Sequence, residues 1–202
     1  MSIILSLQGS MAVGKTTAVN YIKNNASYVN ISFENNENVI KEVKNRGLDK
    51  NSFNDYIEIQ RLWINNEITR YEKAKAFNCS IMDFGAEEIE FYTLNYPKSI
   101  GKEWNIEGEL HHELELLRKC MPERILFLDA SEKTLRRNKE RDKTRSRSFF
   151  EYYLKNLLPL KKEWFSKKVN VDFLDVDNLN EMKLGTEVKR WMDKCIEEER
   201  LK

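Results

Sequence analysis

A glycine-bracketed segment near the start of the chain constrains the fold more than any other feature of the sequence. Residues 3–7 are apolar except for Ser6, and a helical pattern begins at Thr16. The residues from Gly9 to Thr16 match the pattern G-x-x-x-x-G-K-[ST]. A strand, such a loop and a helix, in that order, form a unit whose backbone amides surround phosphate groups. The sequence therefore predicts a phosphate-binding loop that leads into the N-terminus of a helix.

Each fixed residue of this loop has a chemical reason. Glycine adopts backbone conformations barred to other residues and lets main-chain amides approach phosphate oxygens, and the N-terminus of the following helix adds positive potential. Lys15 is expected to bridge the β- and γ-phosphates of ATP, and the Thr16 hydroxyl to complete the shell of a Mg²⁺ ion. The predicted nucleotide-binding residues of the loop are Gly9, Met11, Ala12, Val13, Gly14, Lys15, Thr16 and Thr17. A chance match is expected in roughly one window in tens of thousands.

Short apolar runs alternate with longer amphipathic stretches along the chain. Strands are predicted at 2–8, 27–33, 79–84, 124–130 and 169–176, and helices at 16–25, 53–77, 86–94, 103–120, 132–145, 149–166 and 179–199. Strands that alternate with helices indicate a parallel sheet covered on both faces. Together with the loop, the pattern predicts an α/β protein with the P-loop NTPase fold. We expect one domain over residues 1–202, in which helices sandwich a five-stranded parallel sheet.

A basic segment separates the fourth predicted strand from the long helical pattern at 149–166. It has no apolar residue between Leu135 and Phe149. Its arginines are Arg136, Arg137, Arg141, Arg145 and Arg147. Because such a segment cannot bury a face, we predict an arginine-rich lid at about 133–148, which lies over a ligand. The alternative is a solvated helix whose arginines are neutralised by Glu140 and Asp142.

Carboxylates stand where three of the predicted strands end. Asp83 ends the strand at 79–84, where it can hold the hydration shell of Mg²⁺, and Asp129 competes for this role from the next strand. Glu34 follows the second strand and is the candidate base for the proton of an acceptor hydroxyl, with an ordinary loop carboxylate as the alternative. Glu87 and Glu88 are interpreted as helix-start acids that the helix dipole favours.

Several stretches together resemble the deoxynucleoside kinase group of the P-loop nucleoside and nucleotide kinases. They are GSMAVGKTT (9–17), FENNENV (33–39), IQRLWINNEITR (59–70) and RDKTRSRSFFEYYLKNLLPLKKEWF (141–165). In weaker form the similarity covers nearly the whole chain. The resemblance implies a five-stranded parallel sheet, ATP with Mg²⁺, and transfer of the γ-phosphate to a hydroxyl of a nucleoside-like acceptor.

By matching position, the resemblance makes Glu34 the general base and Gln60 a contact to the edge of the acceptor's base. It also implies that lid arginines hold the phosphates. Two positions depart from the family. Asp83-Phe84-Gly85 stands where the family has acid-arginine-serine, and Glu67 stands near the place of an arginine, with Arg70 following it.

The motifs and the resemblance together give the predicted site. The catalytic residues are Lys15, Glu34, Asp83, Arg141 and Arg145. The residues that contact the acceptor are Glu34, Gln60, Trp63, Arg70 and Arg147, with Trp63 chosen as a stacking residue because it neighbours Gln60. Arg137 and Arg141 join the nucleotide-binding set, and Thr16 and Asp83 are the metal ligands.

The composition limits partners and location. The net charge is +1 although 33% of the residues are charged, and a chain without basic excess argues against a nucleic-acid or membrane-surface partner. No apolar run approaches the ~20 residues of a membrane span, and the first run is too short for a signal peptide. Three separated cysteines without a CxxC pair suit a reducing compartment. We expect a cytoplasmic protein with a small-molecule acceptor; a homodimer is left open.

The sequence favours an ATP-dependent kinase, a phosphotransferase whose acceptor is an alcohol group of a nucleoside- or nucleotide-like molecule. The departures from the family pattern leave a hydroxylated metabolite or antibiotic open as the acceptor. A non-kinase regulatory module, which binds ATP and hydrolyses it slowly without an acceptor, is the alternative from another class. A nucleic-acid end kinase is the third, and the near-neutral charge counts against it.

Overall fold

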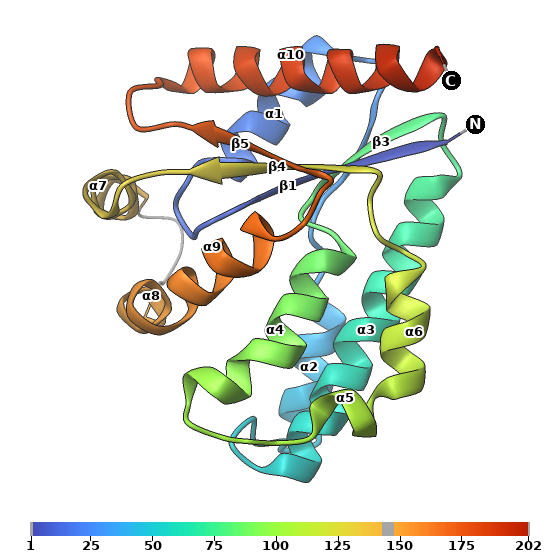
Figure 1. Cartoon of the computed structure of the whole chain (residues 1–202), viewed down its shortest axis with the longest axis vertical. Helices are drawn as coiled ribbons and strands as arrows, with labels where there is room; N and C mark the ends of the chain where they lie inside the picture. Colours follow the sequence, from blue (N-terminus) through green and yellow to red (C-terminus); the bar gives the residue numbers. More distant parts are fainter. Residues whose placement is uncertain (1, 143–147, 202) are drawn as a thin grey trace.

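Five parallel strands form the centre of the molecule. The computed structural model describes residues 2–142 and 148–201. The strands are β1 (Ile3–Gly9), β2 (Asn30–Ser32), β3 (Cys79–Asp83), β4 (Arg124–Asp129) and β5 (Val171–Asp175), in the spatial order β2-β3-β1-β4-β5 (Figure 1). The predicted α/β fold with a five-stranded parallel sheet is therefore confirmed.

The sequences of the central strands are largely apolar because helices cover both faces of the sheet there. Every residue of β1 and of β3 is buried, whereas β2 and β5 at the two edges are partly exposed. Strands that are buried on both faces are continuous in hydrophobicity rather than alternating. Ser6 and Gln8 are polar residues within β1, and the site described below supplies their hydrogen-bond partners.

Helices lie on both faces of the sheet (Figure 1). On one face α1 (Lys15–Asn25) packs against α10 (Glu181–Arg200), and on the other lie α3 (Phe53–Lys75), α4 (Ala86–Ser99) and α9 (Leu158–Ser166). The remaining helices are α2 (Glu37–Asn45), α5 (Ile106–Glu109), α6 (His111–Arg118), α7 (Glu132–Arg141) and α8 (Phe150–Tyr152). In Figure 1, α7 and α8 lie beyond the carboxyl ends of β4 and β5.

Besides shifted boundaries, three segments form elements that the sequence prediction did not give. The polar stretch after β2 forms α2, which buries only Val39 and so gives little hydrophobic signal. The helix predicted at 103–120 divides at Leu110 into α5 and α6. The helix predicted at 149–166 contains a π-helical turn, η1 (Tyr153–Leu157), just before Pro159. Since proline cannot donate a hydrogen bond to the preceding turn, the helix widens there.

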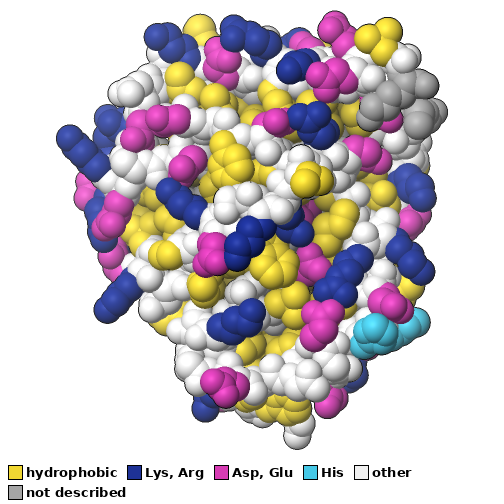
Figure 2. All heavy atoms as spheres, in the orientation of Figure 1, with side chains coloured by type: hydrophobic (Ala, Val, Ile, Leu, Met, Phe, Trp, Pro, Cys, Tyr) yellow, Lys and Arg dark blue, Asp and Glu magenta, His cyan; other side chains and the backbone are white. Residues whose placement is uncertain are grey.

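The surface carries charges of both signs. On the face shown in Figure 2, acidic and basic side chains are interspersed, and no large area of a single sign stands out. Among the residues that the structure describes, no helix has the length and apolar character needed to cross a membrane.

Candidate active site

The loop after β1 combines positive-φ residues with a helix N-terminus, the features expected of the predicted phosphate-binding loop. Gly9 has φ 134°, and a Cβ atom there would lie well inside 3.0 Å of the Leu128 carbonyl oxygen, so only glycine fits. Ala12, at φ 62°, also adopts the left-handed region that side chains disfavour. Such conformations persist only where the surrounding structure imposes them. Helix α1 then begins at Lys15, directly after Gly14, so its N-terminus faces the loop.

Lys15 is enclosed by this loop. Its Nζ atom donates to the Gly9 carbonyl at 3.3 Å and to the Ser10 carbonyl at 3.1 Å. Burial, followed by the positive charge of Lys161, lowers the pKa of Lys15 to about 8, while Asp83, Glu88 and Glu34 oppose the shift. A triphosphate beside the ammonium group would favour its charged form and raise this pKa again.

Thr16 and Asp83 meet beside the loop. The parallel register of β1 and β3 pairs Leu7 with Asp83, which places this carboxylate at the end of the sheet where the loop begins. Thr16 Oγ1 lies 3.4 Å from Asp83 Oδ2. A hydroxyl and one carboxylate suit Mg²⁺, which keeps several waters and takes further oxygens from phosphates.

Asp129, the competing strand-end carboxylate, has other partners. Its Oδ1 atom lies 2.6 Å from Lys162 Nζ and accepts a hydrogen bond from the Ala130 amide at 2.9 Å. Over residues 2–142 and 148–201, no group of three or more His, Cys, Asp and Glu residues is arranged to hold a metal ion. The predicted metal ligands Thr16 and Asp83 do lie next to each other, and their role stays a prediction.

A cavity of about 1160 Å³ at the carboxyl ends of the strands brings most of the predicted site together. Its volume suits a nucleotide together with a small acceptor. The predicted residues that line it are Gly9, Met11, Ala12, Val13, Gly14, Lys15, Thr16, Thr17, Glu34, Gln60, Trp63, Asp83, Arg137 and Arg141. Arg145 and Arg147 fall outside the described residues. Arg70 is not among the residues that line the cavity.

One end of the cavity lies over α3 and α4. Gln60 is buried there, and its Oε1 atom accepts a hydrogen bond from the Thr93 hydroxyl at 2.9 Å. Its amide nitrogen therefore remains as a donor toward a ligand. Trp63, Phe84 and Tyr92 line the same cavity with aromatic rings. We refer to this region, lined by Gln60, Trp63, Phe84 and Tyr92, as the acceptor end, after the role that the sequence predicts for it.

Glu34 also lines the cavity, at the end of β2. Its side chain reaches solvent within the cavity, yet desolvation by the surrounding protein raises the pKa of this carboxyl, and the negative charge of Asp83 adds to the shift. Lys15 and Arg70 oppose it. A carboxylate of raised pKa is a better proton acceptor than an ordinary glutamate.

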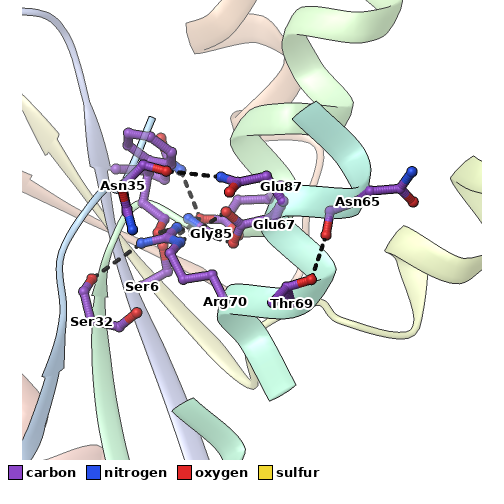
Figure 3. A network of polar contacts seen from close by, with 12 residues as sticks. Ser6, Ser32, Asn35, Asn65, Glu67, Thr69, Arg70, Gly85 and Glu87 are labelled. Carbon is purple, nitrogen blue, oxygen red and sulfur yellow. Dashed lines mark hydrogen bonds and ion pairs between the residues drawn. The ribbon is translucent and has the colours of Figure 1, made fainter. Parts of the chain in front are cut away.

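Arg70 is held by other groups of the protein, among them Glu67 and Ser32 (Figure 3). Its guanidinium makes two hydrogen bonds to the Glu67 carboxylate, at 2.9 and 3.0 Å, and also donates to the carbonyls of Ser32 and Phe84. Arg70 thereby ties α3 to the ends of β2 and β3. Burial raises the pKa of Glu67 to about 7, and Arg70 acts against that shift. The predicted acceptor contact from Arg70 stays a prediction, but this side chain is already engaged.

A second carboxylate, Glu87, is fully buried close to Gly85 and Ser6 (Figure 3). It accepts hydrogen bonds from Ser6 Oγ, from Gln8 Nε2 at 2.7 Å and from the Gly85 amide at 3.0 Å. These contacts pair the Ser6 hydroxyl and the Gln8 amide nitrogen of β1, and they hold the turn after β3. Within that turn Phe84 has φ 52°, a strained conformation for a side chain of this size.

Helix α7 presents part of the predicted arginine-rich lid to the loop. Arg137 and Arg141 line the cavity, and Asn138 Nδ2 donates to the Ala12 carbonyl at 3.0 Å. Arg136 instead pairs with Glu132 and Glu151. The remainder of the predicted lid, residues 143–147, lies outside the described residues.

The sequence did not single out several residues of the site. Glu88, interpreted as a helix-start acid, lines the cavity, as do Tyr92 and Tyr153. Lys161 is buried against the loop. One signal was present for Lys161, because it falls at every-fourth spacing with the buried residues Leu157 and Phe165. A lysine within such an apolar stripe indicates a buried cation.

The fold is similar to that of solved nucleoside and nucleotide kinases. Deoxyadenosine kinase from M. mycoides with bound dCTP matches with a TM-score of 0.69 at 15% identity, over 95% of this chain and 100% of that chain. The same kinase with products dCMP and a flexible dCDP bound gives 0.67 at 16% identity, over 95% and 100%. Thymidylate kinase from Candida albicans gives 0.64 at 13% identity, over 96% and 92%.

The sequence itself gives no such match. No protein-family model matches it, and no curated protein matches it either. The chain therefore shares the fold of the P-loop nucleoside and nucleotide kinases at low sequence identity, and the predicted resemblance is confirmed at the level of the fold.

Proposed function

We propose that this chain transfers the γ-phosphate of ATP to a hydroxyl group of a neutral, nucleoside-like acceptor. The observation that carries the proposal is a single cavity with two different ends. Lys15 and Thr16 belong to the phosphate loop, whereas Gln60 and Trp63 lie at the acceptor end. Glu34 lines the same cavity. The shared fold supports this reading by analogy.

The reaction needs charge stabilisation and one proton acceptor. The loop amides, Lys15 and the N-terminus of α1 would stabilise the phosphate oxygens. Thr16 and Asp83 would hold Mg²⁺, which, when bound, neutralises charge on the triphosphate. Glu34 would accept the proton of the acceptor hydroxyl. Arg137 and Arg141 would face the donor nucleotide from α7.

The charges around the acceptor end favour a neutral acceptor over a nucleoside monophosphate. The residues that define this end, Gln60, Trp63, Phe84 and Tyr92, are uncharged, and the carboxylate of Glu34 lines the same cavity. Arg70, the cation predicted to contact the acceptor, is bonded twice to Glu67. A monophosphate would thus bring negative charge toward Glu34 while Arg70 is already engaged.

A paired acceptor screen tests the proposal. Release of ADP from MgATP is measured with each of the common nucleosides and, separately, with its monophosphate. We expect at least one nucleoside to raise ADP release well above the rate without acceptor, and its monophosphate to raise it much less. A preference for monophosphates would contradict the neutral acceptor. The same slow rate with every compound would instead favour the non-kinase ATP-binding module.

A further inference from the structure

A second lysine reaches the phosphate loop from α9. Lys161 is only 1% exposed, and its Nζ atom lies 3.0 Å from the carbonyl oxygen of Gly9. Lys15 Nζ lies 3.3 Å from the same oxygen, so the two ammonium groups are no further apart than the sum of these distances. The charge of Lys161 is also the second largest cause of the lowered pKa of Lys15.

Lys161 is held there by a carboxylate of the cavity. Its Nζ atom lies 2.6 Å from Glu88 Oε2, and Glu88 lines the cavity. The two groups form an ion pair, but their angles do not meet the geometry of a hydrogen bond. Glu88 Oε2 therefore has no hydrogen-bond partner. A buried ion pair gives little net stability compared with apolar residues of the same volume. Packing alone therefore does not explain a lysine in this apolar stripe.

Two buried hydroxyl groups adjoin the same place. Ser10 is 3% exposed and Tyr153, in the π-helical turn η1, is 2% exposed. Neither hydroxyl has a hydrogen-bond partner of normal geometry, although the two lie close enough for Ser10 to affect the pKa of Tyr153. Both residues line the cavity. Buried polar groups without partners are costly, and π-helical turns occur often at functional sites.

Lys161 does not itself line the cavity but lies directly behind Glu88, which does. We propose that Lys161, with the hydroxyls of Ser10 and Tyr153, contacts the terminal phosphate once a triphosphate enters the loop beside Lys15. Glu88 holds the ammonium group beside the loop until the triphosphate arrives, and the terminal phosphate then takes over that contact. This proposal rests on the proposed function, since it assigns protein contacts to the terminal phosphate, the group that ATP has and ADP lacks. Charge that develops on the transferred phosphoryl group would be shared between two lysines.

Calorimetric titrations with MgATP and with MgADP separate this role from general nucleotide binding. Lys161→Met is expected to weaken MgATP binding by about tenfold to a hundredfold, the range of a charge-assisted hydrogen bond, and to leave MgADP binding within about twofold. The matched control is Lys162→Met, one residue along, whose side chain pairs with Asp129. It should leave both affinities unchanged.

Glu88→Gln is expected to change the MgATP affinity in the opposite direction. This variant tests the role of Lys161 even if Lys161→Met does not fold. Removing the competing negative charge should strengthen MgATP binding relative to MgADP. Equal effects of either variant on the two nucleotides, or no effect of Lys161→Met, would overturn the proposal for Lys161. A wild-type protein that binds neither nucleotide would refute the proposed function itself, which is a different result.

Discussion

Thr16 Oγ1 and Asp83 Oδ2 lie 3.4 Å apart, although 67 positions separate the two residues in the chain. The contact exists because β1 and β3 are parallel neighbours whose register aligns Leu7 with Asp83. The hydroxyl follows the loop after β1 and the carboxylate ends β3. Two oxygen atoms from different segments thus reach one point, and under the proposed function phosphate oxygens and waters would complete a magnesium shell there.

Asp83→Asn is expected to weaken the magnesium dependence of ATP binding. Loss of one carboxylate removes a charged ligand, so the affinity for MgATP should fall while the affinity for ATP in the presence of EDTA changes little. Calorimetry with and without Mg²⁺ measures both. Asp129→Asn is the matched control, because Asp129 also ends a strand but pairs with Lys162. Equal behaviour of the two variants would contradict the assignment of Asp83.

Glu34→Gln is expected to lower kcat by about 10²–10⁴, the usual contribution of a general base, while MgATP still binds. The base must be deprotonated, so the rate should fall as the pH decreases through the pKa of Glu34. Because desolvation and Asp83 raise this pKa above its ordinary value, the acid limb should lie above that of an ordinary glutamate. A pH profile of kcat/KM locates the limb.

The same profile gives an internal check on the assignment of Glu34. Asp83→Asn removes the neighbouring negative charge, so it should move the acid limb to lower pH in whatever activity that variant retains. An acid limb that persists unchanged in Glu34→Gln would show that another group is the base.

Arg70→Met is expected to destabilise the fold by about 3–5 kcal/mol, because it leaves Glu67 buried without its partner. The pKa of Glu67 is already raised to about 7 by burial. A folded-state pKa above the unfolded one means that stability falls as the pH rises between the two values. Without the guanidinium, the folded-state pKa of Glu67 should rise further above the unfolded-state pKa. Arg70→Met should therefore lose more stability above neutrality than at mildly acidic pH.

Arg61→Met is the matched control on the same helix. The Arg61 side chain is 39% exposed, and its ion pairs with Glu58 and Glu113 lie at the surface. Such pairs contribute about 0–1 kcal/mol. Urea denaturation at several pH values compares the two variants. A similar small loss in both would mean that the pair of Glu67 and Arg70 does not hold the site together.

Gly9→Ala is expected to abolish MgATP binding. Its φ of 134° and the closeness of the Leu128 carbonyl leave no room for a Cβ atom, so the loop must move. Gly47→Ala is the control: Gly47 also has a positive φ, of 63°, but a Cβ there would meet nothing within 4 Å. It should cost about 1–2 kcal/mol of stability, because a side chain disfavours the left-handed region, and it should leave binding intact. Calorimetry and thermal unfolding distinguish the two effects.

Most of the fold was predictable because its signals are local. Continuous apolar runs marked the buried strands, and the glycine-bracketed loop fixed the start of α1. The elements that escaped prediction have weak or ambiguous local patterns. Helix α2 buries only Val39, and the π-helical turn before Pro159 cannot be distinguished from an ordinary helix by spacing alone.

Much of the cavity lining was predicted segment by segment. The loop residues and Asp83 follow from motif and strand position, and Gln60 from the resemblance. Contacts between segments were not predictable in this way. The engagement of Arg70 by Glu67 and the pairing of Lys161 with Glu88 depend on how helices pack over the sheet. In the sequence, Glu88 has the position of a helix-start acid and Lys161 is a lysine among apolar residues. Their pairing becomes visible only when the structure places α4 and α9 next to the loop.

The most direct test of the account follows the γ-phosphate itself. ATP labelled at that phosphate is incubated with the protein, Mg²⁺ and the nucleoside that gives the highest ADP release, and the products are separated. We predict that the label appears in a phosphomonoester of the nucleoside, and that Lys15→Ala lowers this transfer by orders of magnitude. Label that is released only as inorganic phosphate, at the same rate with and without the nucleoside, would contradict a kinase.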